Sequence, residues 1–371
     1  MSIFITVSIL SSILFISYRF VARFSLSRYF ITTPYLATFF LIGGNTLYQN
    51  LFGATYSFSP FVERVSVVLF VLTLGIIMGT VFTSLHWKRM GKLWVYSSIL
   101  LILFSLLSRI LQQTEWAWFF HPVFFAYNDE LVQRIIGLED RSTVLHIGAT
   151  QMVIIFYLTP IILMMMRHYL RGALEEIVLD KFDKSVSKKS AYTFLLFLLI
   201  SIGIVFVKSV WIQDKIPFLF DFVLAMIIGF GYGIWVRSAQ QEKVSLLTSR
   251  AQKIGTIGLY FYISMVIYRQ FPLFLSHAEE AQLSLVIVKL VLIAIIALFL
   301  VLKLFPNFVF HEKLVAAIAG WTFMMNAPVV CMHGMRSVVN TYGPAPHVLL
   351  TVPPIILWTI NYVQLLLGLI L

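Results

Sequence analysis

The sequence predicts an all-α polytopic membrane protein with about ten transmembrane helices and two re-entrant hairpins, arranged as two inverted five-helix repeats. Three observations support this fold class. Of the 371 residues, 60% are hydrophobic and only 12% are charged, whereas about a quarter of a soluble domain is charged. The apolar residues gather in stretches that approach the roughly 20 residues a membrane helix needs. One long charged stretch, residues 167–189, lies near the middle of the chain.

The long apolar stretches define the predicted spans. They are residues 3–18, 30–62 (one helix and a loop), 65–85, 93–108, 143–166, 190–207, 216–236, 254–268, 281–302 and 347–371. The first stretch has no basic residue ahead of it, so we interpret it as a retained span and not as a signal peptide.

Two further segments do not have the pattern of simple spans. Residues 116–133 are aromatic, with a proline in the middle, and residues 314–335 are apolar with a polar break at 326–328. We predict a re-entrant hairpin at each, a structure tolerated at membrane depth only where protein or a water cavity surrounds the tip. For the second segment, an ordinary span with a proline kink is the alternative.

The distribution of basic residues predicts the orientation of the chain. With the N-terminus outside, the loops at 19–29, 86–92 and 237–253 fall inside and are basic, while the acidic loop at 277–280 falls outside. Both termini are then outside a cell (inner) membrane. The predicted divisions are a first repeat at 1–166, a cytoplasmic linker at 167–189 and a second repeat at 190–371.

Several classes of protein are excluded by composition and motifs. The formal net charge is +11, but the basic residues form no continuous stripe, which argues against a nucleic-acid partner. The single Cys331 excludes an internal disulfide, a cysteine zinc cluster and an iron–sulfur site. There is no HExxH, nucleophile elbow or Walker loop, so we do not expect an enzyme or a cofactor.

Inverted repeats with interrupted elements in matching positions are typical of secondary transporters. Residues 320–361 read GWTFMMNAPVVCMHGMRSVVNTYGPAPHVLLTVPPIILWTIN. The Ala-Pro at the tip, the Met-bearing arm after it, the aromatic-Gly-Pro at 342–344 and the Val-Pro at 352–353 resemble the sodium/glutamate symporter family. Residues 142–170, with Ala149-Thr150, and the loop after the third span are also similar to that family.

The resemblance implies a hairpin domain that moves against a static scaffold, sodium as coupling ion, and a homodimer within the lipid bilayer. The chain departs from the family at both tips, where glycines let bare backbone approach the substrate. Here the first tip reads FFHPVFF and the second TFMMNAP. We therefore expect a small organic anion or amino acid as the substrate, carried by a divergent, elevator-type symporter that is not a standard glutamate carrier.

At the first break, His121 and Pro122 are the candidate substrate-binding residues. Proline frees a backbone carbonyl on the preceding turn, and histidine can donate to an anion. The alternative for His121 is an interfacial position among belt aromatics. Asn128 is a third candidate, and its alternative role is to cap the second arm of the hairpin.

At the second break, Asn326 and Pro328 are the corresponding candidates. An amide within hydrocarbon needs a partner, which could be a substrate, a sodium ion near Asn326 or another loop. Thr322 is a weaker candidate for substrate binding. Thr322 and His333 each have the alternative of bonding to their own helix, and Cys331 has the alternative of plain packing.

Charged groups inside spans are costly and suggest function. Asp221 and Lys289 both fall within predicted spans, and they could pair with each other. If Lys289 faces the interior, it could replace a coupling cation or hold an anionic substrate. The alternatives are an interfacial Asp221 and a Lys289 that snorkels.

The glycines of the third and seventh spans predict close helix packing. The pattern of small residues four apart occurs at Gly75 and Gly79, and again at Gly229 and Gly233 with Gly231 between them.

One alternative function belongs to a different class. Aromatic filling of both tips, and the absence of an acidic residue within either, favour a transport-inactive homologue that serves as a membrane anchor or sensor subunit of a larger complex.

Overall fold

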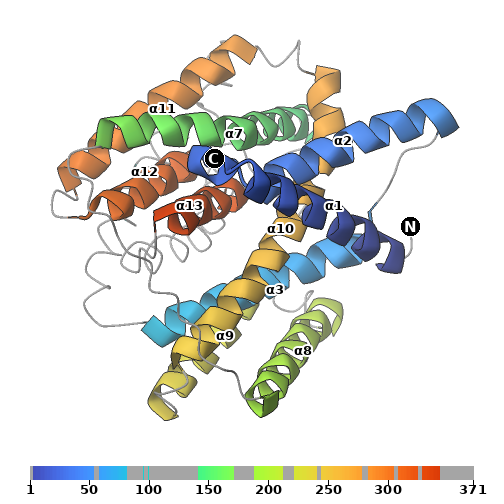
Figure 1. Ribbon diagram of the computed structural model, residues 1–371, viewed down its shortest axis with the longest axis vertical. Helices are drawn as coiled ribbons and strands as arrows, with labels where there is room; N and C mark the ends of the chain where they lie inside the picture. Colours follow the sequence, from blue (N-terminus) through green and yellow to red (C-terminus); the bar gives the residue numbers. More distant parts are fainter. Residues whose placement is uncertain are drawn as a thin grey trace. The chain divides into compact units, whose positions relative to one another are not determined.

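The computed structural model is mostly helical in the part of the chain that it describes, with no strand in that part (Figure 1). The described residues are 3–53, 58–81, 141–170, 188–211, 221–239, 244–277, 283–304, 308–324 and 328–342, with positions 95 and 99.

Four of the described helices are long and apolar enough to cross a membrane: α1 (Ile3–Arg23), α3 (Pro60–Val81), α7 (Arg141–Leu170) and α9 (Asp221–Ala239). The chain is therefore a helical membrane protein. The other helices are α2 (Thr33–Phe52), α8 (Lys188–Trp211), α10 (Val244–His277), α11 (Leu283–Leu304), α12 (Phe310–Met324) and α13 (Pro328–Tyr342), and η1 (Leu26–Tyr29) is a 3-10 turn.

The residues form two compact units. Unit 1 comprises Met1–Arg19, Leu36–Ser84 and Val178–Val266, and unit 2 comprises Phe20–Tyr35, Leu85–Ile177 and Ile267–Leu371. Each unit takes helices from both of the halves predicted from the sequence.

Unit 1 is built on a close contact between α3 and α9. A Cβ added at Gly75 would overlap the carbonyl oxygen of Met226, and one added at Gly229 would overlap that of Leu72. Gly79 and Gly233 face each other in the same way, with 2.9 Å between Gly79 Cα and a Cβ added at Gly233. The glycines pack the two helices together, as the sequence predicted.

The order of these contacts gives the helix directions. Positions 75 and 79 of α3 meet successively later positions of α9, so α3 and α9 are parallel. The rings of Phe61 on α3 and Phe206 on α8 have centroids 5.3 Å apart, and Thr80 Oγ1 on α3 lies 3.2 Å from Thr248 Oγ1 on α10. These contacts join opposite ends of the helices, so α8 and α10 run antiparallel to α3. The predicted order of membrane crossings stays a prediction.

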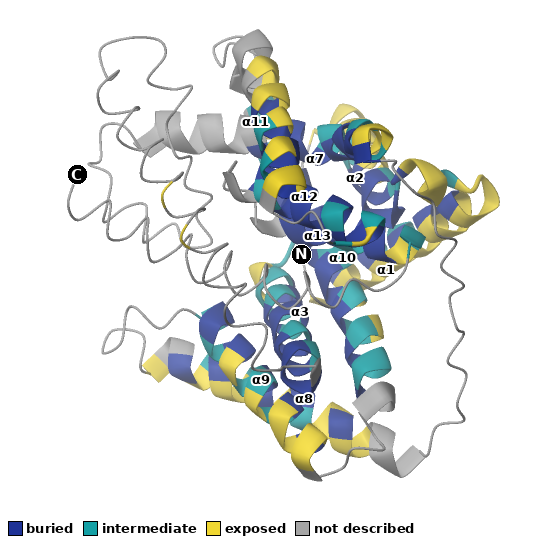
Figure 2. Cartoon of the chain, turned by 90° about the vertical axis from the view of Figure 1, so that its left-hand side faces the viewer, coloured by how far each residue is buried: buried dark blue, intermediate teal, exposed yellow. Residues whose placement is uncertain are grey.

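Unit 2 is arranged around α12. This helix packs against α7, α11 and α13, and every residue from Leu314 to Ala319 is buried. Figure 2 shows the buried residues on the packed faces of the helices. A helix that is apolar on all sides is stable only where protein or lipid surrounds it. Here the residues of α12 are buried mostly by other helices of unit 2.

Candidate functional site

Two described helices flank the second predicted break. α12 ends at Met324 and α13 begins at Pro328, while Asn326 lies outside the described residues. Proline suits the first turn of a helix because it has no N–H to leave unsatisfied there and its φ is already helical. Pro328 therefore starts the second arm and does not kink a continuous helix.

The two arms run antiparallel. The rings of Phe310 and Tyr342 are 5.5 Å apart at the far ends of the arms, and a Cβ added at Gly334 would lie 2.9 Å from Ile318 Cγ1 halfway along. In both pairs the members are equally distant from Asn326 in the sequence. One continuous helix would separate Phe310 from Tyr342 by roughly 48 Å. The structure therefore excludes the kinked-span alternative.

The described part of each arm is short compared with the thickness of a bilayer. Both α12 and α13 have 15 residues, which gives a helix about 22 Å long against a hydrocarbon core of about 30 Å. The hairpin packs against α7 and α11, and its re-entrant placement in a membrane stays a prediction.

Trp321 and Thr322, the last residues of α12 whose side chains the structure describes, both have hydrogen-bond partners within unit 2. Thr322 is fully buried, and its hydroxyl donates to Ile318 O at 2.6 Å in its own helix, which is the bond that the alternative interpretation described. The indole Nε1 of the neighbouring Trp321 donates to Leu290 O on α11 at 2.9 Å. The role of Thr322 in substrate binding stays a prediction.

A buried polar cluster lies further along α13. His333 Nε2 is 3.0 Å from Thr32 Oγ1. The imidazole also contacts the rings of Tyr35 and Phe156, at centroid distances of 5.0 and 5.6 Å. The bond to Thr32 joins His333 to a segment 301 residues away in the chain, a partner that the sequence did not indicate.

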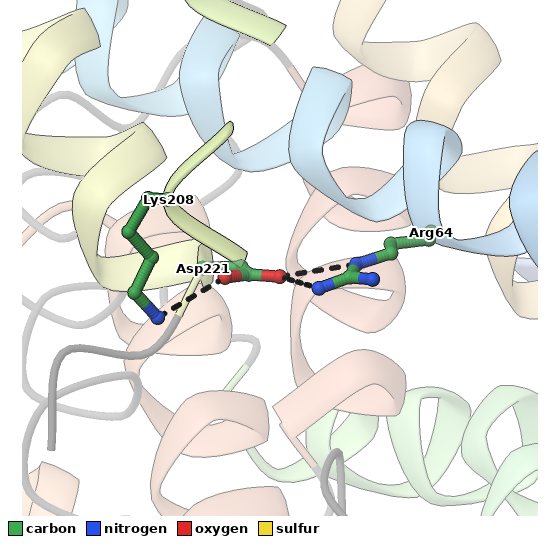
Figure 3. Close-up of polar contacts among 3 residues, drawn as sticks. All are labelled: Arg64, Lys208 and Asp221. Carbon is green, nitrogen blue, oxygen red and sulfur yellow. Dashed lines mark hydrogen bonds and ion pairs between the residues drawn. The ribbon is translucent and has the colours of Figure 1, made fainter. Parts of the chain in front are cut away.

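In unit 1, Asp221 pairs with two cations at one end of α3, α8 and α9 (Figure 3). Arg64 donates to Asp221 Oδ2 through Nε at 3.0 Å and also through Nη2. Lys208 Nζ donates to Oδ1 at 3.3 Å. The Lys208 side chain is 7% exposed, that of Asp221 19% and that of Arg64 40%. The three side chains form one network of partly buried charge.

The predicted pairing of Asp221 with Lys289 is not among these contacts. Lys289 lies in α11 of unit 2, but its side chain lies outside the described residues, so its role stays a prediction. His121, Pro122 and Asn128 of the first predicted hairpin also lie outside the described residues. Among the described residues, no group of three or more His, Cys, Asp or Glu side chains could hold a metal ion.

Sequence reasoning missed the partners of Asp221 and of His333. Arg64 and Lys208 lie just outside the predicted spans, so the sequence indicated that they were loop residues. For the hairpin a signal was present: His333, Ser337 and Thr341 recur at every fourth residue and share one face of α13.

Comparison with known proteins gives no match among family models, curated proteins or solved structures. The resemblance to the sodium/glutamate symporter family stays a prediction.

Proposed function

We propose that this chain is a sodium-coupled secondary transporter of a small organic anion or amino acid, working by an elevator motion of its hairpin-bearing unit. The observation that carries the proposal is the antiparallel hairpin of α12 and α13, whose two short arms are packed within unit 2. Interrupted helices of this kind expose backbone polar groups at membrane depth, where transporters bind substrates and ions.

The division of the described helices into units also supports the proposal. In the first half, α3 belongs to unit 1 and α7 to unit 2. In the second half, α8 and α9 belong to unit 1, and α11 and the hairpin belong to unit 2. Both halves thus contribute earlier helices to one unit and later helices to the other, as an inverted repeat with a scaffold and a moving domain requires.

A transport-inactive subunit is the second candidate function. The burial of the described side chains closest to the hairpin tip favours it. Trp321 is fully buried, and the Thr322 hydroxyl is bonded to its own helix, so neither side chain presents a polar group to a ligand. A membrane anchor needs the fold but not an accessible site.

Uptake into proteoliposomes separates the two candidates. The panel is labelled glutamate, aspartate, other small carboxylates and neutral amino acids, with an inward sodium gradient and a potassium control. We expect sodium-dependent accumulation of at least one compound, lost in Asn326→Ala and kept in Asn340→Ala, a matched change at an exposed position of α13. No accumulation from folded, correctly oriented protein would favour the inactive subunit, and co-purification would then identify its complex.

A further inference from the structure

The chain enters unit 2 briefly near its N-terminus. Residues Phe20–Tyr35 belong to unit 2, although the residues before them in α1 and after them in α2 belong to unit 1. Within this stretch, residues 25–32, here called the strap, include η1 and two non-glycine residues with positive φ, Ser25 at 50° and Phe30 at 60°. Such backbone costs energy unless its surroundings hold it.

The strap needs partners for its backbone because much of it is not helical. Phe30 is fully buried and Thr32 nearly so. Buried carbonyl groups outside helices require donors from elsewhere, and one face of α13 supplies them. Ser337 Oγ donates to Phe30 O at 3.3 Å, and His333 Nε2 lies 3.0 Å from Thr32 Oγ1.

The contact continues to the end of α13. Thr341 Oγ1 lies 3.5 Å from Ser27 O, and the ring of Tyr342 lies 6.1 Å from that of Phe30. From His333 to Thr341 the partners on the strap run backwards from Thr32 to Ser27, so the strap lies antiparallel along α13. A polar stripe on α13 therefore matches the strap along its length.

Arg167 of α7 holds the strap from a second element. Its Nη1 donates to Arg28 O at 3.5 Å, and its guanidinium carbon lies 5.6 Å from the ring centroid of Tyr342. One side chain thus touches both the strap and the last residue of α13.

We propose that the strap is part of the hairpin body: residues 25–32 and α13 move together in the transport cycle, with His333 as the positioning residue that fixes the strap. The kinetic part of this inference rests on the proposed transport function, whereas the structural part does not. The flanking parts of α1 and α2 then take up any displacement between the strap and unit 1.

Hydrogen exchange tests the structural part on the full-length protein. Thr32→Val keeps the shape of the side chain but removes its bond to His333. Because a hydrogen bond is worth about 1 kcal/mol net, we expect amide exchange to become about fivefold faster in both the strap and α13. Thr159→Val is the matched control, since this buried hydroxyl of unit 2 donates to Ile155 O of its own helix at 2.7 Å. Faster exchange confined to the strap would overturn the proposal.

Cross-linking tests the kinetic part. In a Cys331→Ala background, the double variant Ser27→Cys and Thr341→Cys is treated with a short bis-maleimide, and loss of both thiols reports the link. We expect the linked protein to keep uptake within about twofold of the unlinked protein. An efficient link that abolishes uptake would show that the strap and α13 move apart. If the unlinked protein has no uptake, the proposed function has failed, and the exchange measurement still decides the structural part.

Discussion

The helix pair α3–α9 of unit 1 and the hairpin α12–α13 of unit 2 both form close contacts, but different kinds of atoms meet in each. The α3–α9 contact brings backbone against backbone through glycines on both helices. The hairpin arms meet through side chains, such as Ile318 against Gly334 and Phe310 against Tyr342. Backbone cannot retreat without moving a whole helix, whereas side chains can shift. We therefore expect the contact in unit 1 to be rigid and that in unit 2 to be adaptable.

The difference suits the roles that the proposed function assigns. A scaffold needs helices that keep one arrangement, and glycine packing supplies this without polar groups. A moving unit needs its interrupted helices supported by hydrogen bonds, and the polar stripe of α13 provides them. The predictions below test whether the two contacts differ as their composition implies.

The largest effect is expected at the glycine contact. In Gly229→Ala, the new methyl group would overlap the carbonyl oxygen of Leu72, so α3 and α9 must separate. We expect a loss of about 3 kcal/mol or more in unfolding free energy, measured as a lower midpoint of thermal unfolding. Gly231→Ala is the matched control, since nothing lies within 4 Å of a Cβ there, and it should be neutral or slightly stabilising. Equal losses in both variants would contradict the packing argument.

A smaller loss is expected when the charge network of unit 1 loses its carboxylate. Asp221→Asn leaves the buried Lys208 ammonium without its anionic partner, at a cost of about 2–3 kcal/mol in unfolding free energy. Arg64 contributes less, because its side chain is 40% exposed and water screens it.

A double-mutant cycle measures the coupling within this network. Adding Lys208→Met to Asp221→Asn removes the stranded charge, so stability should partly return. Strictly additive losses in the double variant would show that Lys208 does not depend on Asp221.

The sequence predicted the coarse structure well because apolar composition and glycine spacing are local signals. The all-helical class, the break near Pro328 and the presence of close-packing glycines follow from residues near one another in the chain, although the sequence did not indicate that α3 and α9 pack against each other. The partners of Asp221 do not, because Arg64 lies 157 positions away. The charged residues also made the predicted spans too short. The third span was predicted to begin after Arg64, but α3 begins at Pro60, and the sixth was predicted to end before Lys208, but α8 continues to Trp211.

The contacts of the strap could not be predicted from the sequence either. A run such as 25–32 has no periodicity that would predict burial, and its contacts with α13 span about 300 positions, as the Thr32–His333 bond shows. The stripe on α13 was visible in the sequence, but nothing local indicated what it faces. Long-range partners of irregular backbone require the fold itself.

The smallest effect is expected from the same substitution within the hairpin. In Gly334→Ala, the added methyl group would lie 2.9 Å from Ile318 Cγ1 and 3.3 Å from Thr159 Cγ2. Ile318 Cγ1 must shift to make room, but it is a side-chain atom and not backbone, and alanine favours the helix by about 1 kcal/mol over glycine. We expect a loss of about 1–2 kcal/mol in unfolding free energy, smaller than that of Gly229→Ala in the same assay. A loss as large as that of Gly229→Ala would show that the hairpin is packed as rigidly as the scaffold, which would remove the physical basis for assigning motion to unit 2.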